Sequence, residues 1–288
     1  MTVAGSRKRT ISAVLLVATL AACGGGDGRS DGSFFNPQEI PLETYSAEQI
    51  FERGEYELTN NNPGEAAFYF AEIERLYPYS EWAKRALIMQ AFAYHKDQDY
   101  PNSRSAAQRF IDFYPAEDDA AYAQYLLALS YYDQIDEVGR DQGLTFQALQ
   151  SLRAVIEGYP DSEYARSAVL KFDLAFDHLA GKEMEIGRYY LRRDHYTAAI
   201  NRFRVVVEDF QTTTHTAEAL HRLVESYLSL GLNHEAQTAG AILGHNYRGS
   251  EWYEDSYKLL TGRGLAPAFY KDNWLGAAYR QTIKGEWL

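Results

Sequence analysis

The chain has 288 residues, of which 46% are hydrophobic and 14% aromatic, so it can bury a continuous core and is not wholly disordered. Its net charge of −12 argues against nucleic-acid binding, which needs a basic surface, and its single cysteine excludes an internal disulfide or a cysteine-rich zinc site. No window holds the roughly 20 apolar residues that a membrane-spanning helix requires.

The first 23 residues have the pattern of a bacterial export signal that ends in a lipidation site. Residues 7–9 are Arg-Lys-Arg, residues 11–20 are mostly apolar, and residues 20–23 are Leu-Ala-Ala-Cys. An apolar stretch of about ten residues is too short to span a bilayer, which predicts a cleaved signal peptide over residues 1–22. The last four residues resemble a lipobox, so Cys23 is expected to carry a covalent lipid. The alternative is an ordinary secretory signal that contains a cysteine by chance.

Residues 23–45 are expected to form the lipidated cysteine and a flexible linker, because residues 24–33 are rich in Gly, Asp and Ser. Two or more acyl chains would hold the protein stably at a membrane. Gly24, rather than an acidic residue, follows the cysteine, and in the enteric sorting pattern this predicts the periplasmic face of the outer membrane.

Residues 46–247 repeat a two-helix pattern with a recurrent end. Apolar-periodic segments close at residues 76–78, 113–115, 158–160 and 209–211, three times with Tyr-Pro and once with Phe-Gln. Proline cannot continue a helix, so these sites predict helix ends, at intervals of 37, 45 and 51 residues. A tetratricopeptide repeat has about 34 residues.

Small and aromatic residues recur at the positions where tetratricopeptide helices pack together. Five copies contain, in chain order, Gly54, Ala66, Phe70 and Ile73; Ala91, Tyr94, Tyr100, Ala107 and Phe110; Ala148, Leu152 and Val155; Gly187, Tyr190, Tyr196, Ala199, Phe203 and Val206; and Tyr227, Gly231 and Ala236. In the third copy, residues 134–143 are inserted between the two helices. The chain is therefore predicted to be all-α, a tetratricopeptide-repeat solenoid of about five helix pairs with an additional C-terminal helix. Such a solenoid offers a concave face to peptides and partner domains.

Residues 248–288 are predicted to form a capping helix and an aromatic extension. Apolar residues recur at helical spacing from Ser250 to about Leu260, and glycines at 262 and 264 with Pro267 then end the helix. Because the capping helix already covers the last repeat, the aromatic and basic residues after Pro267 are expected to contact a partner or the membrane. They are Phe269, Tyr270, Lys271, Trp274, Tyr279, Arg280, Lys284 and Trp287.

The helical register also predicts a groove in the first two repeats that binds an extended strand. Five residues of the first helices are expected to point into it: Phe51, Glu55, Arg85, Phe92 and Lys96. This assignment depends on register, since a shift of one residue rotates a side chain by about 100°.

No pattern indicates an enzyme, a metal site or a cofactor other than the lipid on Cys23. Glu218, His221 and Glu225 share one helix face and could hold a metal, but helix-surface charge pairing explains them equally well. Residues 28–32 match the G-x-S-x-G pattern, which requires a preceding strand and a following helix that this linker lacks.

The combination of anchor and repeats resembles the BamD family, lipoprotein subunits of the bacterial outer-membrane β-barrel assembly machinery. The most specific stretches are residues 172–190, FDLAFDHLAGKEMEIGRYY, and residues 198–203, AAINRF. The insertion with VGRDQ at residues 138–142 resembles alphaproteobacterial members. The chain departs from the family in Gln211, which replaces a proline, and in residues 248–288, which the shorter enteric members lack.

The resemblance implies a division of labour along the repeats. The N-terminal repeats would receive unfolded β-barrel precursors, and the C-terminal repeats would dock the membrane-proximal POTRA domain of the barrel-forming subunit BamA, with other Bam lipoproteins nearby. In the family, the arginine of an Asn-Arg pair in the fourth repeat makes the docking ion pair, which assigns that role to Asn201 and Arg202 here. A guanidinium suits this role because it can bind a carboxylate through two hydrogen bonds.

Two other functional classes remain open from the residues alone. The chain could be another periplasmic repeat lipoprotein, one that binds peptidoglycan or a division or polysaccharide-export complex. It could also be an enzyme built on a repeat scaffold, although no convergent polar site supports that class.

Overall fold

A computed structural model describes residues 41–138 and 141–278 of the chain, so Cys23 and the signal peptide lie outside the described residues. The chain divides into two units, residues 1–44 and residues 45–288. In the first unit the described part contains one 3₁₀ helix, Leu42–Thr44. No helix among the described residues is long and apolar enough to cross a membrane.

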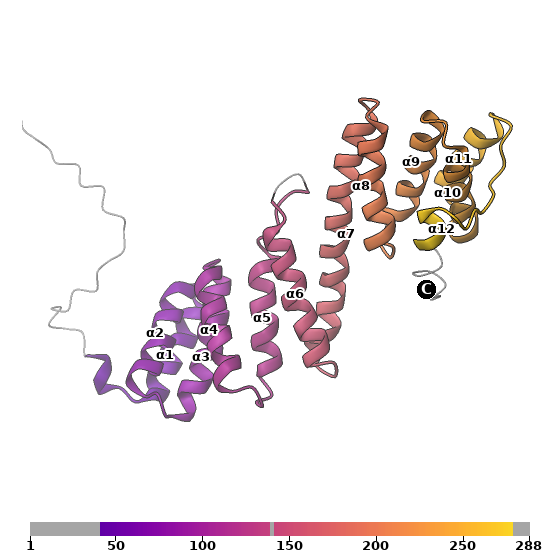
Figure 1. The fold of residues 1–288 in the computed structure, drawn as a ribbon. Helices are drawn as coiled ribbons and strands as arrows, with labels where there is room; N and C mark the ends of the chain where they lie inside the picture. Colours follow the sequence, from indigo (N-terminus) through magenta and orange to yellow (C-terminus); the bar gives the residue numbers. More distant parts are fainter. Residues whose placement is uncertain (1–40, 139–140, 279–288) are drawn as a thin grey trace, which may run out of the picture. The chain divides into compact units, whose positions relative to one another are not determined.

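The second unit is entirely helical where the structure describes it (Figure 1). Five helix pairs follow one another, and two further helices complete it. They are α1 (Ala47–Thr59) and α2 (Pro63–Leu76); α3 (Glu81–Lys96) and α4 (Tyr100–Phe113); α5 (Ala120–Tyr132) and α6 (Gly143–Gly158); α7 (Glu163–Leu191) and α8 (Tyr196–Asp209); α9 (Thr216–Ser229) and α10 (Asn233–Asn246); then α11 (Glu251–Thr261) and α12 (Trp274–Ala278). The all-α repeat prediction is confirmed.

Local residue chemistry sets many of the helix boundaries. The side chains of Ser46, Ser80, Ser162 and Ser250 each accept a hydrogen bond from a backbone N–H in the first turn of α1, α3, α7 and α11. The second helix of each pair ends before an aromatic residue, at Tyr77, Tyr114, Tyr159, Phe210 and Tyr247. Helix α8 ends in the same way although Gln211 replaces proline, so the proline is not required to stop the helix.

In the first and fourth pairs, a glycine lets an aromatic ring approach the facing helix closely. A Cβ added at Gly54 would lie 2.6 Å from Cε1 of Phe70, and one at Gly187 would lie 2.4 Å from Cε1 of Phe203. The repeat-related alanines 66, 107, 148, 199 and 236 are all fully buried. Each helix from α1 to α10 packs on the next in the chain, and the first helices of neighbouring pairs also touch, as in α1 with α3 and α5 with α7.

Helix α7 differs from the others in its length of 29 residues. Its first half packs on α6, where Ala168 joins a core with Leu152. Its second half packs on α8, where Met184 joins a core with Phe203. The middle of α7 therefore lies at the junction of two sets of helices.

The segment after α11 packs against its own chain, contrary to the sequence prediction. In residues 265–278, the C-terminal arm, the indole Nε1 of Trp274 donates to the hydroxyl oxygen of Tyr227 at 2.7 Å, and Leu275 is fully buried. The amide of Gln237 donates to the carbonyl oxygen of Ala266 at 2.7 Å.

The expectation that the capping helix alone covers the last repeat is wrong, because Trp274 also contacts Tyr227 of α9 and Tyr270 stacks on His234 of α10. Contact of the arm with a partner or the membrane stays a prediction. In the same arm, Lys271 contacts another residue of the chain. The side chain of Phe269 is 38% exposed. Tyr279, Arg280, Lys284 and Trp287 lie outside the described residues.

Candidate functional site

The predicted docking residue, Arg202, already has a carboxylate partner within the chain. Its Nη1 lies 3.1 Å from Oε2 of Glu183, so the pair joins α8 to α7. The Arg202 side chain is 43% exposed, and the neighbouring Asn201 is exposed. The guanidinium is therefore oriented by α7 and remains accessible at the surface.

The five residues predicted to line an N-terminal groove do not form one surface. Phe51 is 2% exposed and packs against Phe70 and Trp82, with ring centroids 5.2 and 5.0 Å away. Its assignment to the groove is wrong, because Phe51 points to the helix side that the core covers. Phe92 is half-buried against the core of the second and third pairs.

The charged members of that set are exposed, and two of them contact the first pair. The Arg85 guanidinium lies over the rings of Phe51 and Trp82, 5.1 and 4.8 Å from their centroids. The ammonium of Lys96 donates to the carbonyl oxygen of Leu58 at 3.4 Å. Arg85 and Lys96, with Glu55 on α1, remain as candidates for polar contacts to a peptide.

A group of tyrosines between α5 and α7 was not predicted as a site. The ring of Tyr164 lies 5.2 Å from that of Tyr122 and 5.5 Å from that of Tyr125, and the Lys171 ammonium is 5.7 Å from the Tyr125 ring. Burial raises the pKa of Tyr122 to about 12. The spacing of Tyr122 and Tyr125, which places both on one side of a helix, is the sequence signal that could have identified this group.

The three residues considered for a metal are used in ion pairs and in packing. Glu218 pairs with Arg188 at 2.9 Å, and Arg222 pairs with both Glu218 at 3.2 Å and Glu225 at 2.8 Å. No cluster of three potential metal ligands occurs within residues 41–138 and 141–278.

His221 is buried between α9 and α11. Its Nδ1 is 2.8 Å from Oγ of Ser256, and its ring packs against Trp252. Burial lowers the pKa of His221, although the nearby Glu225 carboxylate acts in the opposite direction.

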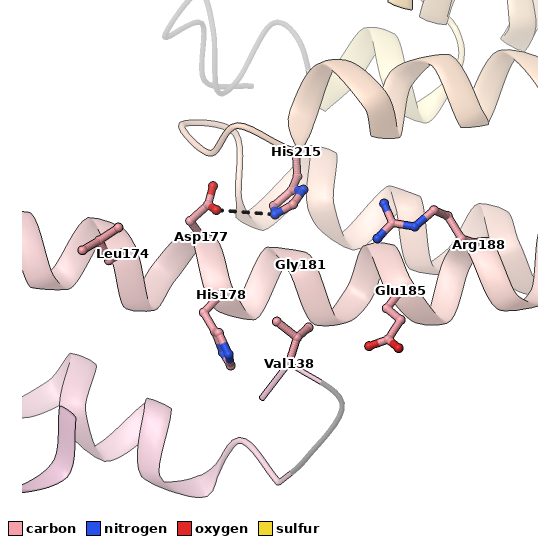
Figure 2. Close-up of a pocket in the computed structure, with 8 residues that line it drawn as sticks. All are labelled: Val138, Leu174, Asp177, His178, Gly181, Glu185, Arg188 and His215. Atoms are coloured by element: carbon pink, nitrogen blue, oxygen red, sulfur yellow. Dashed lines mark ion pairs between the residues drawn. The ribbon is translucent and has the colours of Figure 1, made fainter. Parts of the chain in front are cut away.

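A cavity of about 450 Å³ lies beside the middle of α7. Figure 2 shows its lining, which comes from α7, from Val138 in the segment between α5 and α6, and from His215 before α9. Asp177 and His215 face each other, with 3.4 Å between Oδ2 and Nε2, while His178 and Glu185 point toward the side where Val138 lies.

Comparison with known proteins shows similarity over most of the chain. Residues 43–242 match the model of the YfiO family, described as an outer membrane lipoprotein. A Caulobacter vibrioides protein named outer membrane protein assembly factor BamD is 46% identical over 259 residues, 90% of this chain and 82% of that one. A Rickettsia prowazekii protein of the same name is 40% identical, over 88% of this chain and 96% of that one. A Neisseria meningitidis protein of the same name is 27% identical, over 83% of this chain and 91% of that one.

The family match covers more than half of the chain, and it spans the five helix pairs from α1 almost to the end of α10. The two alphaproteobacterial relatives are similar over about nine-tenths of the chain. The chain belongs to the YfiO family of outer membrane lipoproteins.

Proposed function

We propose that the chain is a lipid-anchored scaffold subunit of the machinery that assembles β-barrel proteins in the outer membrane. The observation that carries this proposal is the 46% and 40% identity, over about nine-tenths of the chain, to proteins named outer membrane protein assembly factor BamD. That name describes an assembly factor, which favours a binding role over an enzyme and over the peptidoglycan or export alternatives.

The C-terminal pairs, from α7 to α10, bind the membrane-proximal POTRA domain of the barrel-forming subunit in this proposal. Arg202 supplies the ion pair and Asn201 lies beside it. Glu183 supports the assignment because it holds the guanidinium at the edge between α7 and α8 before a partner arrives. A side chain ordered in advance loses less conformational entropy on binding.

The N-terminal pairs receive unfolded β-barrel precursors, and other Bam lipoproteins bind the same scaffold. Arg85 supports the first role because its stacking on two aromatic rings fixes an exposed cation beside apolar surface. The lipid on Cys23 holds the scaffold at the periplasmic face of the outer membrane, where precursors arrive.

Purification from membranes in mild detergent, followed by mass spectrometry, tests the proposal. A large β-barrel protein with periplasmic domains should copurify with the wild-type chain, and its amount should fall for Arg202→Glu. Sedimentation with purified peptidoglycan, without any β-barrel protein, would contradict the proposal and support the alternative. Glu157→Arg is the matched control, because Glu157 is an exposed acid on α6, in the third pair rather than the fourth.

A further inference from the structure

The cavity beside α7 owes its shape to one glycine and two fixed walls. Gly181 has no side chain, and a Cβ there would lie 3.2 Å from Nε2 of His215 and 3.7 Å from Cγ1 of Val138. A methyl group at position 181 would therefore press against His215 and would fill the space up to Val138.

Polar contacts hold these walls in place. Asp177 Oδ1 accepts hydrogen bonds from the backbone N–H and the hydroxyl of Thr214, at 2.9 and 2.8 Å, which fixes the turn before α9. On the other side, Nδ1 of His178 lies 3.3 Å from Oε1 of Gln142, just before α6. The cavity is thus formed before any ligand binds, which lowers the entropic cost of binding.

The charge that remains unneutralised at this cavity is negative. Arg188 is paired with Glu218 at 2.9 Å, and the Asp177 carboxylate lies 3.4 Å from Nε2 of His215 and accepts hydrogen bonds from Thr214. Glu185 is exposed and forms no ion pair or hydrogen bond within the part of the chain that the structure describes. A cationic group from outside would find the Glu185 carboxylate available.

Exposed leucines lead along α7 toward the cavity. Leu170 and Leu174 lie one helical turn apart and are 65% and 62% exposed. Leu174 also lines the cavity (Figure 2). At 1.5 Å per residue, Leu174 and Glu185 are about 16 Å apart along the helix, which corresponds to about five residues of extended chain.

This surface is separate from the one that carries Arg202. Glu183, which holds Arg202, precedes Glu185 by two residues, so the two side chains point in directions about 160° apart around α7. A partner bound at Arg202 would leave the cavity side of α7 accessible.

We propose that the α7 cavity, with Leu170 and Leu174, binds a segment of a partner protein that carries an apolar residue about five positions from a lysine or arginine. The apolar side chain covers the leucines and the cation pairs with Glu185. This site goes beyond the proposed function, because it provides a second contact on α7, independent of the Arg202 pair.

Photo-crosslinking in living cells tests this proposal with the full-length, anchored chain. A photoreactive amino acid replaces Leu174, and mass spectrometry maps the crosslinked peptide. We expect one protein segment with the spacing of apolar and basic residues given above. Glu185→Arg should reduce the crosslink by at least about tenfold, because like charges then face each other. Glu185→Gln should reduce it less, and Glu157→Arg should leave it unchanged.

A synthetic peptide of the mapped segment provides the second readout. Its binding to the purified chain should weaken when its basic residue is replaced by glutamate. Thermal melting checks that each variant is folded, and copurification of the β-barrel protein with Glu185→Arg separates this site from the Arg202 surface. Crosslinks only to lipid or to a second copy of the chain, a segment without a basic residue, or a crosslink insensitive to Glu185→Arg would each overturn the proposal.

Discussion

Arg202 of α8 and Glu183 of α7 form an ion pair of 3.1 Å at the surface where we propose that the barrel-forming subunit docks. Because the pair is partly exposed, it contributes about 0–1 kcal/mol to folding, so replacing either residue should leave the fold intact. The pair orients a cation that is available to an external carboxylate.

Arg202→Glu should weaken association with the barrel-forming subunit by about 2–5 kcal/mol, the usual effect of losing one member of a buried interfacial pair. Glu183→Gln is the matched control, because it removes the internal partner and keeps the guanidinium. The barrel-forming subunit should no longer copurify with Arg202→Glu, but it should still copurify with Glu183→Gln in largely the same amount. Equal copurification of both variants with the wild type would exclude Arg202 as the anchor.

Cys23→Ser should release the protein from the outer membrane. Cys23 is the only cysteine of the chain, so incorporation of labelled palmitate reports on this position alone. The serine variant should incorporate no label and should appear as soluble or unprocessed protein. If the serine variant is recovered in the outer-membrane fraction, Cys23 is not the anchor.

Leu275→Ala should destabilise the fold by about 2–5 kcal/mol, because Leu275 of the C-terminal arm is fully buried in a core with residues of α9 and α10. Leu259→Ala makes the same change at a residue of α11 that is 37% exposed, and it should cost at most about 1 kcal/mol. Denaturant unfolding of both variants measures the difference. Truncation after Gly264 should lower the melting temperature further. An unchanged melting temperature with loss of a partner would show that the arm serves binding instead of folding.

Gly187→Ala should destabilise the fourth helix pair by about 1–3 kcal/mol, because the new methyl group would overlap the buried ring of Phe203. Gly158→Ala is the control, since nothing lies within 4 Å of a Cβ there. Alanine at the end of α6 should be neutral or stabilise by up to about 1 kcal/mol. Similar losses of stability in the two variants would show that contact with Phe203 does not determine the effect.

The stability of the contact between α9 and α11 should fall as the medium is acidified. The pKa of His221 is lower in the folded state than its ordinary 6.5, so below about pH 6.5 the unfolded chain binds a proton that the folded chain resists. The loss continues until the pH passes the lowered pKa and then stays constant. The charged groups that act on His221 are Glu218, Arg222 and Glu225 on α9 and Asp255 on α11.

His221→Gln keeps a polar group near Ser256 but does not titrate. Between pH 7.5 and pH 5, the melting temperature of the variant should fall less than that of the wild type. A wild-type decrease equal to that of the variant would exclude His221 as the source of the pH dependence.

The repeat pattern could be predicted from the sequence because it depends on local residue chemistry. Some of its features act within one helix: serines that accept hydrogen bonds from the first turn, and aromatic residues at helix ends. The contact between Gly187 and Phe203 joins two consecutive helices. The insertion in the third pair was also correctly predicted, since α5 ends at Tyr132 and α6 begins at Gly143.

Short-range periodicity and capping residues therefore suffice to predict the fold class, the five helix pairs and the α11 helix. Which side of a helix is covered depends instead on packing between helices. This packing buries Phe51 against Trp82, places Trp274 in contact with Tyr227 and pairs Arg202 with Glu183. These contacts join residues from 19 to 47 positions apart, and their geometry depends on how whole helices are rotated and packed. A rotation of one residue, about 100°, moves a side chain from the surface into the core, and only packing against the neighbouring helices fixes that rotation.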